Sequence, residues 1–215
     1  MIKVLVVDDH DLVRSGIARL LSDAKDLTVV GEAASGEEAV QMVRSLNPDV
    51  VLMDIRMPGI GGLEATRKVV RLDPDVKVIA VTACDDDPYA NRLLQAGAAG
   101  YMTKGAEAEE MVRAIIKVKA GQRYISPEIA QRMALRPFQE GSSSPFEVLS
   151  DREMQITIMI VNCNKVQEIS DKLCLSPKTV NTYRYRIFEK LDIDSDVELT
   201  HLAMKYGVVD METAL

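Results

Sequence analysis

The sequence contains no apolar run long enough to cross a membrane. A spanning helix needs roughly 18 or more consecutive apolar residues, and no such run occurs among the 215 residues. The N-terminal segment reaches two aspartates after only a few apolar residues, which argues against a secretory signal peptide. We therefore expect a cytoplasmic protein with no membrane insertion.

Cysteine and histidine are also scarce, with three and two copies. Cys84, Cys163 and Cys174 are odd in number and show no CxxC spacing, so we expect buried, reduced thiols. His10 and His201 have no ligand-like partners in the sequence, and we expect them to be surface or packing residues. The net charge of -7 argues at first against a nucleic-acid partner. Binding depends, however, on where the charge is placed.

The first 120 residues alternate short β-branched runs with amphipathic patterns, and such alternation predicts a doubly wound α/β domain with a parallel sheet. The expected strands are Lys3–Val7, Thr28–Glu32, Val50–Met53, Lys77–Val81 and Gly100–Met102. The expected helices are Asp11–Ser22, Ser35–Arg44, Gly62–Arg71, Pro88–Ala96 and Ala106–Lys119. In the flavodoxin-like strand order 2-1-3-4-5, strands one and three would be neighbours.

The pattern changes after residue 120. Ser126 and Pro127 begin a short helix to about Leu135, and the stretch Pro137–Pro145 has the composition of a flexible linker. Only helical patterns follow. The expected helices run from Asp151 to Val161, Val166–Leu173, Lys178–Leu191 and Asp196–Lys205. Two short helices joined by a tight turn predict a small all-α helix-turn-helix domain. The chain therefore divides into 1–120, a linker over 121–146, and 147–215.

Acidic residues follow two strands that should be neighbours in the sheet. Asp8 and Asp9 end the first strand, and Asp54 ends the apolar third strand. Three converging carboxylates repel each other unless a cation neutralises them, and an oxygen-only set suits Mg²⁺. The alternative is that Asp8 and Asp9 form a solvated loop and helix cap.

Two further polar residues complete a candidate phosphate site. Thr82 ends the fourth strand, and Lys104 follows the fifth. A carboxylate such as that of Asp54 can accept a phosphoryl group as a nucleophile, and a cation, an ammonium and a hydroxyl can stabilise the transferring oxygens. Taken singly, a loop lysine is usually solvated and a terminal threonine usually packs, so the argument rests on the combination.

The helix Lys178–Leu191 carries two faces. Val180, Tyr183, Ile187 and Leu191 should point inward. The opposite side offers groups for base edges and phosphates, namely Lys178, Thr179, Asn181, Thr182, Arg184, Tyr185, Arg186 and Lys190. The alternative is a solvated face of an interaction domain. Four basic residues stand against one acid between Ser176 and Leu191, so one copy should bind DNA modestly and two copies better.

Residues 1–120 resemble the receiver domain of response regulators. The resemblance rests on Asp8-Asp9 and on the stretches MDIRMPGIGG, VTA and GYMTKG. It implies that Asp54 accepts phosphate from a sensor histidine kinase. It also implies that Asp8, Asp9, Asp54 and the backbone carbonyl of Arg56 hold Mg²⁺, and that Thr82 and Tyr101 form a switch pair.

Residues 149–206 resemble the LuxR-type helix-turn-helix domain, and the combination resembles the NarL/FixJ family. Within it, the stretches LQAGAAGYMTKGA and LCLSPKTVNTYRYRIFEKL resemble the GacA/UvrY group. This implies a transcriptional activator that is not an enzyme, answers to a membrane sensor histidine kinase and has small regulatory RNA genes among its targets. In our hypothesis the receiver covers the third helix of the domain until phosphorylation releases it. Homodimers would then form through Val197, Leu199, Leu202 and Ala203 of the last helix.

Two other functions remain open at this point. A phosphatase with an aspartyl-phosphate intermediate would want a second aspartate two positions after the nucleophile, where Arg56 stands. A sigma-like DNA-binding subunit would share the C-terminal helices but has no use for the acidic residues.

Overall fold

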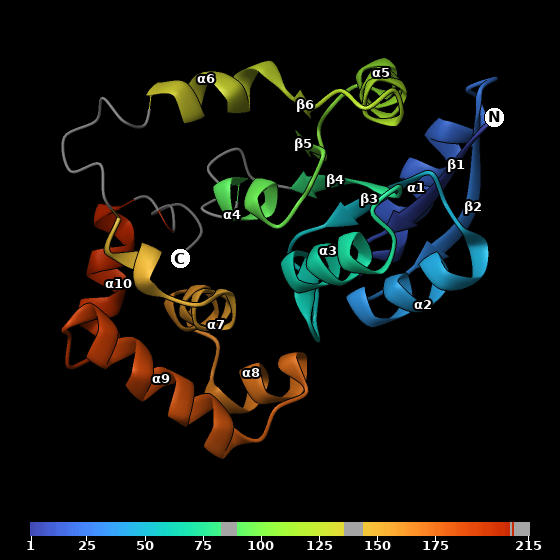
Figure 1. The fold of residues 1–215 in the computed structure, drawn as a ribbon. Helices are drawn as coiled ribbons and strands as arrows, with labels where there is room; N and C mark the ends of the chain where they lie inside the picture. Colours follow the sequence, from blue (N-terminus) through green and yellow to red (C-terminus); the bar gives the residue numbers. More distant parts are fainter. Residues whose placement is uncertain (83–89, 136–143, 207, 209–215) are drawn as a thin grey trace. The chain divides into compact units, whose positions relative to one another are not determined.

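The computed structural model describes residues 1–82, 90–135, 144–206 and 208. Figure 1 traces two compact units, Met1–Arg132 and Met133–Leu215. The division of the chain into 1–120, 121–146 and 147–215 stays a prediction. Most of the flexible stretch predicted at Pro137–Pro145 lies outside the described residues, as do the expected start of the fourth helix at Pro88 and Cys84. No helix of the described ranges is long and apolar enough to cross a membrane.

The first unit contains a parallel sheet in the order β2-β1-β3-β4-β5-β6. Its main strands are β1 (Ile2–Val7), β2 (Leu27–Ala33), β3 (Val50–Asp54), β4 (Lys77–Thr82) and β5 (Gly100–Thr103). The predicted order 2-1-3-4-5 is confirmed. The structure adds β6 (Tyr124–Ile125), whose two residues lie parallel to β5 at the sheet edge. Two residues are too few to give a periodic signal in the sequence, which is why the prediction had five strands.

Helices cover both faces of this sheet (Figure 1). They are α1 (Asp11–Ser22), α2 (Gly36–Leu46), α3 (Gly61–Leu72), α4 (Ala90–Gln95) and α5 (Ala108–Lys119). A further helix, α6 (Pro127–Leu135), follows β6. Successive strand residues point to opposite faces. Val4 and Val6 pack with Ile17 of α1 and Ile115 of α5, whereas Leu5 and Val7 belong to a core with residues of α2 and α3. Because both faces are buried, the strands read as continuous apolar runs.

The turn after β3 requires glycine at position 62. A Cβ atom on Gly62 would lie 2.0 Å from the backbone oxygen of Asp54, so any side chain here would collide with the end of β3. The amide of Gly62 donates a hydrogen bond to the carbonyl of Ile55, at 3.0 Å. Glu37 of α2 also anchors the turn, because its Oε1 accepts a hydrogen bond from the Ile60 amide at 3.0 Å. These contacts fix the strand end that carries Asp54.

The second unit is helical throughout its described residues. A short 3₁₀ turn η2 (Pro145–Val148) precedes α7 (Asp151–Val161), α8 (Val166–Leu173), α9 (Pro177–Leu191) and α10 (Asp196–Lys205). A capping box between Ser150 and Glu153 is present at the start of α7. The core includes Val180 and Ile187 from the inward face of α9, as predicted.

Two expectations about side-chain burial are wrong. Cys163 and Cys174 are free thiols, but they are exposed. Both have positive φ, 58° and 52°, because they stand in the turns that end α7 and α8, and such turns lie at the surface. In α10, Leu199 and Ala203 are fully buried within their own unit, while Val197 is 64% exposed. The apolar surface that α10 can offer a partner is therefore smaller than predicted.

Candidate functional site

An acidic cluster forms where β1 and β3 end. The two strands pair in parallel with Val7 opposite Met53, so the residues that follow them are brought together. Asp8 and Asp54 are 1% and 3% exposed, although both are carboxylates. One ligand atom from each of Asp8, Asp9, His10 and Asp54 lies within 4.8 Å of the others. The predicted convergence of three carboxylates is thus present in the structure.

Lys104 supplies the positive charge of this cluster. Its Nζ lies 2.6 Å from Oδ2 of Asp8 and 3.0 Å from Oδ2 of Asp54. The lysine is positioned by β4 and β5, because its amide donates to the carbonyl of Thr82 at 2.6 Å. An ion pair that is largely removed from water is worth more than one at the surface, since the effective dielectric constant is lower. Lys104 therefore offsets part of the carboxylate repulsion.

Burial dominates the electrostatics of Asp54. It raises the pKa of the carboxyl above its ordinary value, the negative charge of Asp8 adds to the rise, and Lys104 opposes it. Burial alone would lower the pKa of Lys104, but hydrogen bonding and attraction to Asp8 and Asp54 outweigh it and raise that pKa. The lysine thus stays charged, while the carboxylates retain an unneutralised negative charge that favours a further cation.

Three other predicted residues of the first unit lie on the strands of the sheet or directly after them. Thr82 is the last residue of β4 and is 1% exposed. Tyr101 of β5 is fully buried and lies opposite Ala80. Arg56 is exposed, and its amide donates to Oδ1 of Asp54 at 3.3 Å. The structure therefore brings Thr82 and Arg56 to the ends of strands beside Asp54, whereas Tyr101 lies inside the sheet.

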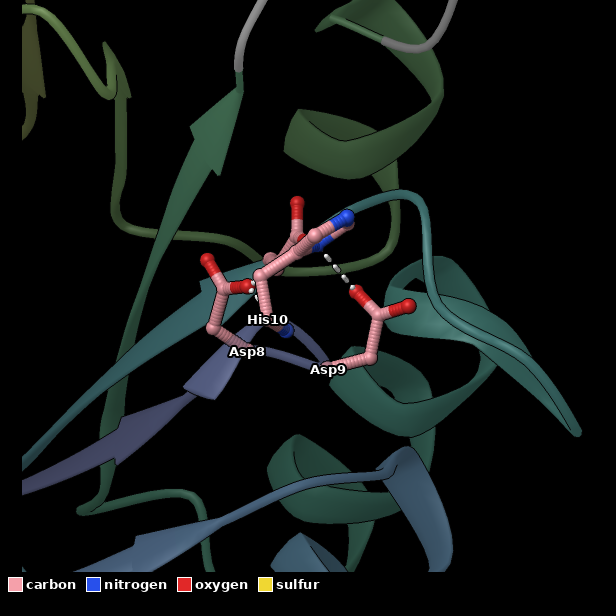
Figure 2. A group of neighbouring side chains, drawn as sticks. Asp8, Asp9 and His10 are labelled. Atoms are coloured by element: carbon pink, nitrogen blue, oxygen red, sulfur yellow. Dashed lines mark hydrogen bonds and ion pairs between the residues drawn. The ribbon is translucent and has the colours of Figure 1, made fainter. Parts of the chain in front are cut away.

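Two residues of this region were missed or misjudged from the sequence. The expectation that His10 has no ligand-like partners is wrong, since its Nδ1 lies 3.0 Å from Oδ1 of Asp9 and 3.5 Å from Oδ1 of Asp8 (Figure 2). Arg14 donates from Nη1 to the carbonyl of Asp8 at 2.7 Å and forms ion pairs with Asp11 and Glu32. Only the Asp11–Arg14 spacing, three residues apart on one helix, was visible in the sequence.

Helix α9 carries the candidate DNA-contacting residues. Its N-cap is Ser176, whose Oγ accepts a hydrogen bond from the Thr179 amide at 3.1 Å. Lys178, Thr182, Tyr185 and Arg186 are exposed, and Thr179, Asn181 and Arg184 are half-buried. The exposed fraction of Tyr185 is 72%, which is high for an aromatic residue. The predicted outward row of α9 is thus available for contact over most of its length.

Two basic side chains of α9 are held within their own unit. The guanidinium of Arg184 makes two hydrogen bonds to the carboxylate of Asp196 at the start of α10, one from Nε at 2.8 Å and one from Nη2. Lys190 donates to Oε2 of the buried Glu153, at 2.6 Å. Lys190 is exposed as well, so Lys178 and Arg186 are the exposed cations of the helix that these contacts do not hold.

Comparisons with known proteins agree with the two-unit organisation. The response regulator receiver domain matches residues 4–116, and the luxR family of bacterial regulatory proteins matches residues 147–203. Response regulator GacA of Pseudomonas syringae pv. syringae is 69% identical, and the alignment covers 98% of this chain and 99% of the relative. Response regulator UvrY of Escherichia coli K12 is 57% identical, with 99% and 98% covered.

A solved structure shares the whole architecture. The response regulator ChrA of a heme-sensing two-component system is 28% identical with a TM-score of 0.55, and the match covers 97% of this chain and 98% of ChrA. Together with the strand-end cluster and the helix-turn-helix unit, these matches define what the chain is. It belongs to the response regulators of the NarL/FixJ type, in the GacA/UvrY group, and is a phosphorylation-dependent, DNA-binding regulator of transcription.

Proposed function

We propose that Asp54 is the residue that accepts the phosphoryl group. The observation that carries this assignment is its position: Asp54 is the last residue of the central strand β3, almost fully buried, and in contact with Lys104. A carboxylate oxygen of Asp54 attacks the phosphorus, an acyl phosphate bond forms, and the bond to the donor breaks. When the donor is a phosphohistidine, the leaving imidazole nitrogen keeps the electron pair of the broken bond.

Residues around Asp54 are suited to the charge that develops on the phosphoryl oxygens. The Lys104 ammonium, which lies between Asp8 and Asp54, can move its contact from the carboxylate to a phosphoryl oxygen. The hydroxyl of Thr82, at the end of the neighbouring strand, can donate to another oxygen. Through the buried Tyr101 of β5, the changed position of Thr82 would then alter the side of the unit formed by α4 and β5.

The acidic cluster also fits a magnesium ion. Its donors are oxygens, and in the described part of the chain Oδ1 of Asp9 is buried and accepts no hydrogen bond. Asp8, Asp9 and Asp54 would hold the ion together with the carbonyl of Arg56, which follows Asp54 by two residues. When bound, the ion supplies positive charge to the phosphoryl oxygens. Arg14 fixes the backbone of Asp8 and so keeps the two carboxylates of this loop in place.

The phosphoryl donor would be a membrane sensor histidine kinase, and the regulator would act in the cytoplasm. The receiver promotes only its own phosphorylation and dephosphorylation, so the chain is not an enzyme with a separate substrate. The GacA and UvrY relatives are named response regulators, which supports a phosphoryl donor for this chain. The regulator would act as an activator, with small regulatory RNA genes among its targets.

Helix α9 would read double-stranded DNA. Lys178 and Arg186 are exposed cations for phosphates, and Asn181, Thr182, Tyr185 and Thr179 are placed along the outward face for base edges or backbone. Arg184 belongs to the same row, but its guanidinium is bound by Asp196, so it would first have to leave that ion pair. With few cations per copy, a phosphorylated homodimer on two half-sites would bind much better than one copy.

Labelling with a small phosphodonor tests the central assignment. The full chain is incubated with radiolabelled acetyl phosphate and Mg²⁺, and we expect the parent to take up at most one phosphate and Asp54→Asn to take up none. Asp75→Asn is the matched control, because Asp75 is an exposed aspartate outside the cluster, and it should label like the parent. Undiminished labelling of Asp54→Asn would refute the assignment. Release of phosphate without any accumulation of labelled parent would instead indicate the phosphatase function.

A further inference from the structure

We propose that His10 is an additional metal ligand of the acidic cluster and makes the site bind first-row transition ions, such as Mn²⁺ and Ni²⁺, through an imidazole nitrogen. The inference rests on the proposed metal site and extends it to a different class of ion. His10 follows Asp8 and Asp9 directly, at the N-cap of α1. Its backbone amide donates to Oδ1 of Asp8 at 2.9 Å, so the backbone is tied to the cluster.

The positions of the donor atoms fit a shared ion. Ligands at roughly 2.1 Å from a metal in octahedral geometry are about 3.0 Å apart when adjacent and about 4.2 Å apart when opposite. Nδ1 of His10 lies 3.0 Å from Oδ1 of Asp9 and 3.5 Å from Oδ1 of Asp8. One donor from each of the four residues lies within 4.8 Å of the rest, so small side-chain rotations suffice to surround an ion. Figure 2 shows the three consecutive side chains grouped in this way.

Oδ1 of Asp9 faces the imidazole of His10 without a well-aligned hydrogen bond. Although the two atoms are 3.0 Å apart, Oδ1 of Asp9 is buried and accepts no hydrogen bond from the described residues. A buried oxygen without a donor is unfavourable, so such atoms call for a partner. An ion bound between the carboxylate and the imidazole would satisfy that oxygen.

Ligand chemistry sets the class of ion. Carboxylates and water suit Mg²⁺, whereas an imidazole nitrogen adds affinity for the later first-row metals, above all Ni²⁺ and Zn²⁺. His10 is 68% exposed in its side chain, so it can turn toward the ion or away from it at little cost in packing. Removing the imidazole should therefore weaken the binding of transition ions and leave Mg²⁺ binding nearly as it is.

The chain supplies its own matched control, because it contains one other histidine. His201 lies in α10 of the second unit and is exposed. Full-length parent, His10→Asn and His201→Asn are each loaded with Mn²⁺, and electron spin echo modulation detects a coordinated ¹⁴N. We expect the imidazole signal in the parent and in His201→Asn and no signal in His10→Asn. A parent without ¹⁴N coupling overturns the proposal, and so does a signal that survives in His10→Asn.

Calorimetric titration gives a second, independent measurement. His10→Asn should lose roughly tenfold or more in Ni²⁺ affinity and less than about threefold in Mg²⁺ affinity, while His201→Asn should match the parent. Equal losses for both ions would mean that His10 only shapes the loop. Thiol binding of Ni²⁺ is common to all three proteins and cancels in the comparison. Labelling of the parent with Mg²⁺ alone tests the phosphoacceptor assignment separately, so failure of one proposal leaves the other standing.

Discussion

The acidic cluster of the receiver and helix α9 of the second unit arrange charge in opposite ways. In the cluster, Asp8 and Asp54 are buried at strand ends and share one lysine. On α9, the cations Lys178 and Arg186 are exposed. Buried charges with incomplete pairing interact strongly with a small ion or phosphoryl group, because water does not screen them. Exposed charges in a row suit a long polyanion, whose phosphates each contribute little.

The two regions also differ in how rigidly they are built. The end of β3 is held by the sheet and by the close approach of Gly62, so Asp54 has little freedom. Two of the four basic residues of α9 instead bind acidic groups of their own unit, Arg184 with Asp196 and Lys190 with Glu153. The first arrangement fixes a reactive group, whereas the second anchors a helix and sets how much charge it presents.

The largest effect that we predict comes from a substitution that disturbs the rigid end of β3. Gly62→Ala places a Cβ atom 2.0 Å from the backbone oxygen of Asp54, and the backbone must move to relieve the clash. We expect a loss of about 3 kcal/mol in the free energy of unfolding, together with slower labelling. Urea unfolding followed by circular dichroism measures the first effect.

Gly16→Ala is the control for this change. Gly16 lies in α1, and a Cβ there meets no described atom within 4 Å. Alanine should raise stability by up to about 1 kcal/mol because it lowers the entropy of the unfolded chain. If Gly62→Ala were as stable as Gly16→Ala, the close contact would not fix the end of β3.

This contrast explains how much the sequence could predict. Parallel strands end at one edge, so the sequence alone was enough to place Asp8, Asp54, Thr82 and Lys104 together. The alternation of elements predicted a doubly wound parallel sheet, and its strand order was taken from the flavodoxin-like arrangement. These conclusions need only the topology, and they do not depend on the angle between any two helices.

Contacts between helices could not be derived in the same way. The pairs Arg184–Asp196 and Lys190–Glu153 join residues 12 and 37 positions apart, and they depend on how α9 lies against α10 and α7. The burial of Leu199 could not be predicted for the same reason, because an apolar residue on a short helix can face either the core or a partner. For His10, the sequence showed that it follows two aspartates, but it did not show where the imidazole points.

A substitution in the second unit should have a stability effect of intermediate size, and it tests the comparison from that side. Glu153→Gln removes the charge that receives hydrogen bonds from Lys190 and from the Ser150 amide. We expect a loss of about 1–3 kcal/mol, typical of hydrogen bonds to a buried charged group. Thermal unfolding of the full chain measures it. Glu189→Gln, an exposed neighbour of Lys190 on α9, should change stability by less than about 0.5 kcal/mol.

The pH dependence of this pair has a definite sign. Burial alone would raise the pKa of Glu153, but Lys190 and Ser150 outweigh it, and the pKa lies below the ordinary value of 4.5. The contribution to stability is therefore full above pH 4.5 and is lost as the pH falls through the lower value of the folded state. The difference between the parent and Glu153→Gln should shrink in that acid range. A difference that stayed constant there would contradict the ion-pair explanation.

The smallest effect concerns the charge that α9 can present to DNA. Asp196→Asn weakens the hold on the Arg184 guanidinium, which is partly exposed, so the loss of stability should stay within about 1 kcal/mol. The released arginine can reach a phosphate, and we expect tighter binding to random-sequence DNA with a salt dependence steeper by about one unit. Lys178→Ala should flatten the salt dependence by a similar amount, because an exposed cation is lost. Asp194→Asn is the matched control, since it removes one exposed acidic charge near the same helix end without releasing an arginine. Affinities measured at several salt concentrations decide the matter: if Asp196→Asn and Asp194→Asn gave the same slope, the ion pair would not restrain Arg184 from DNA.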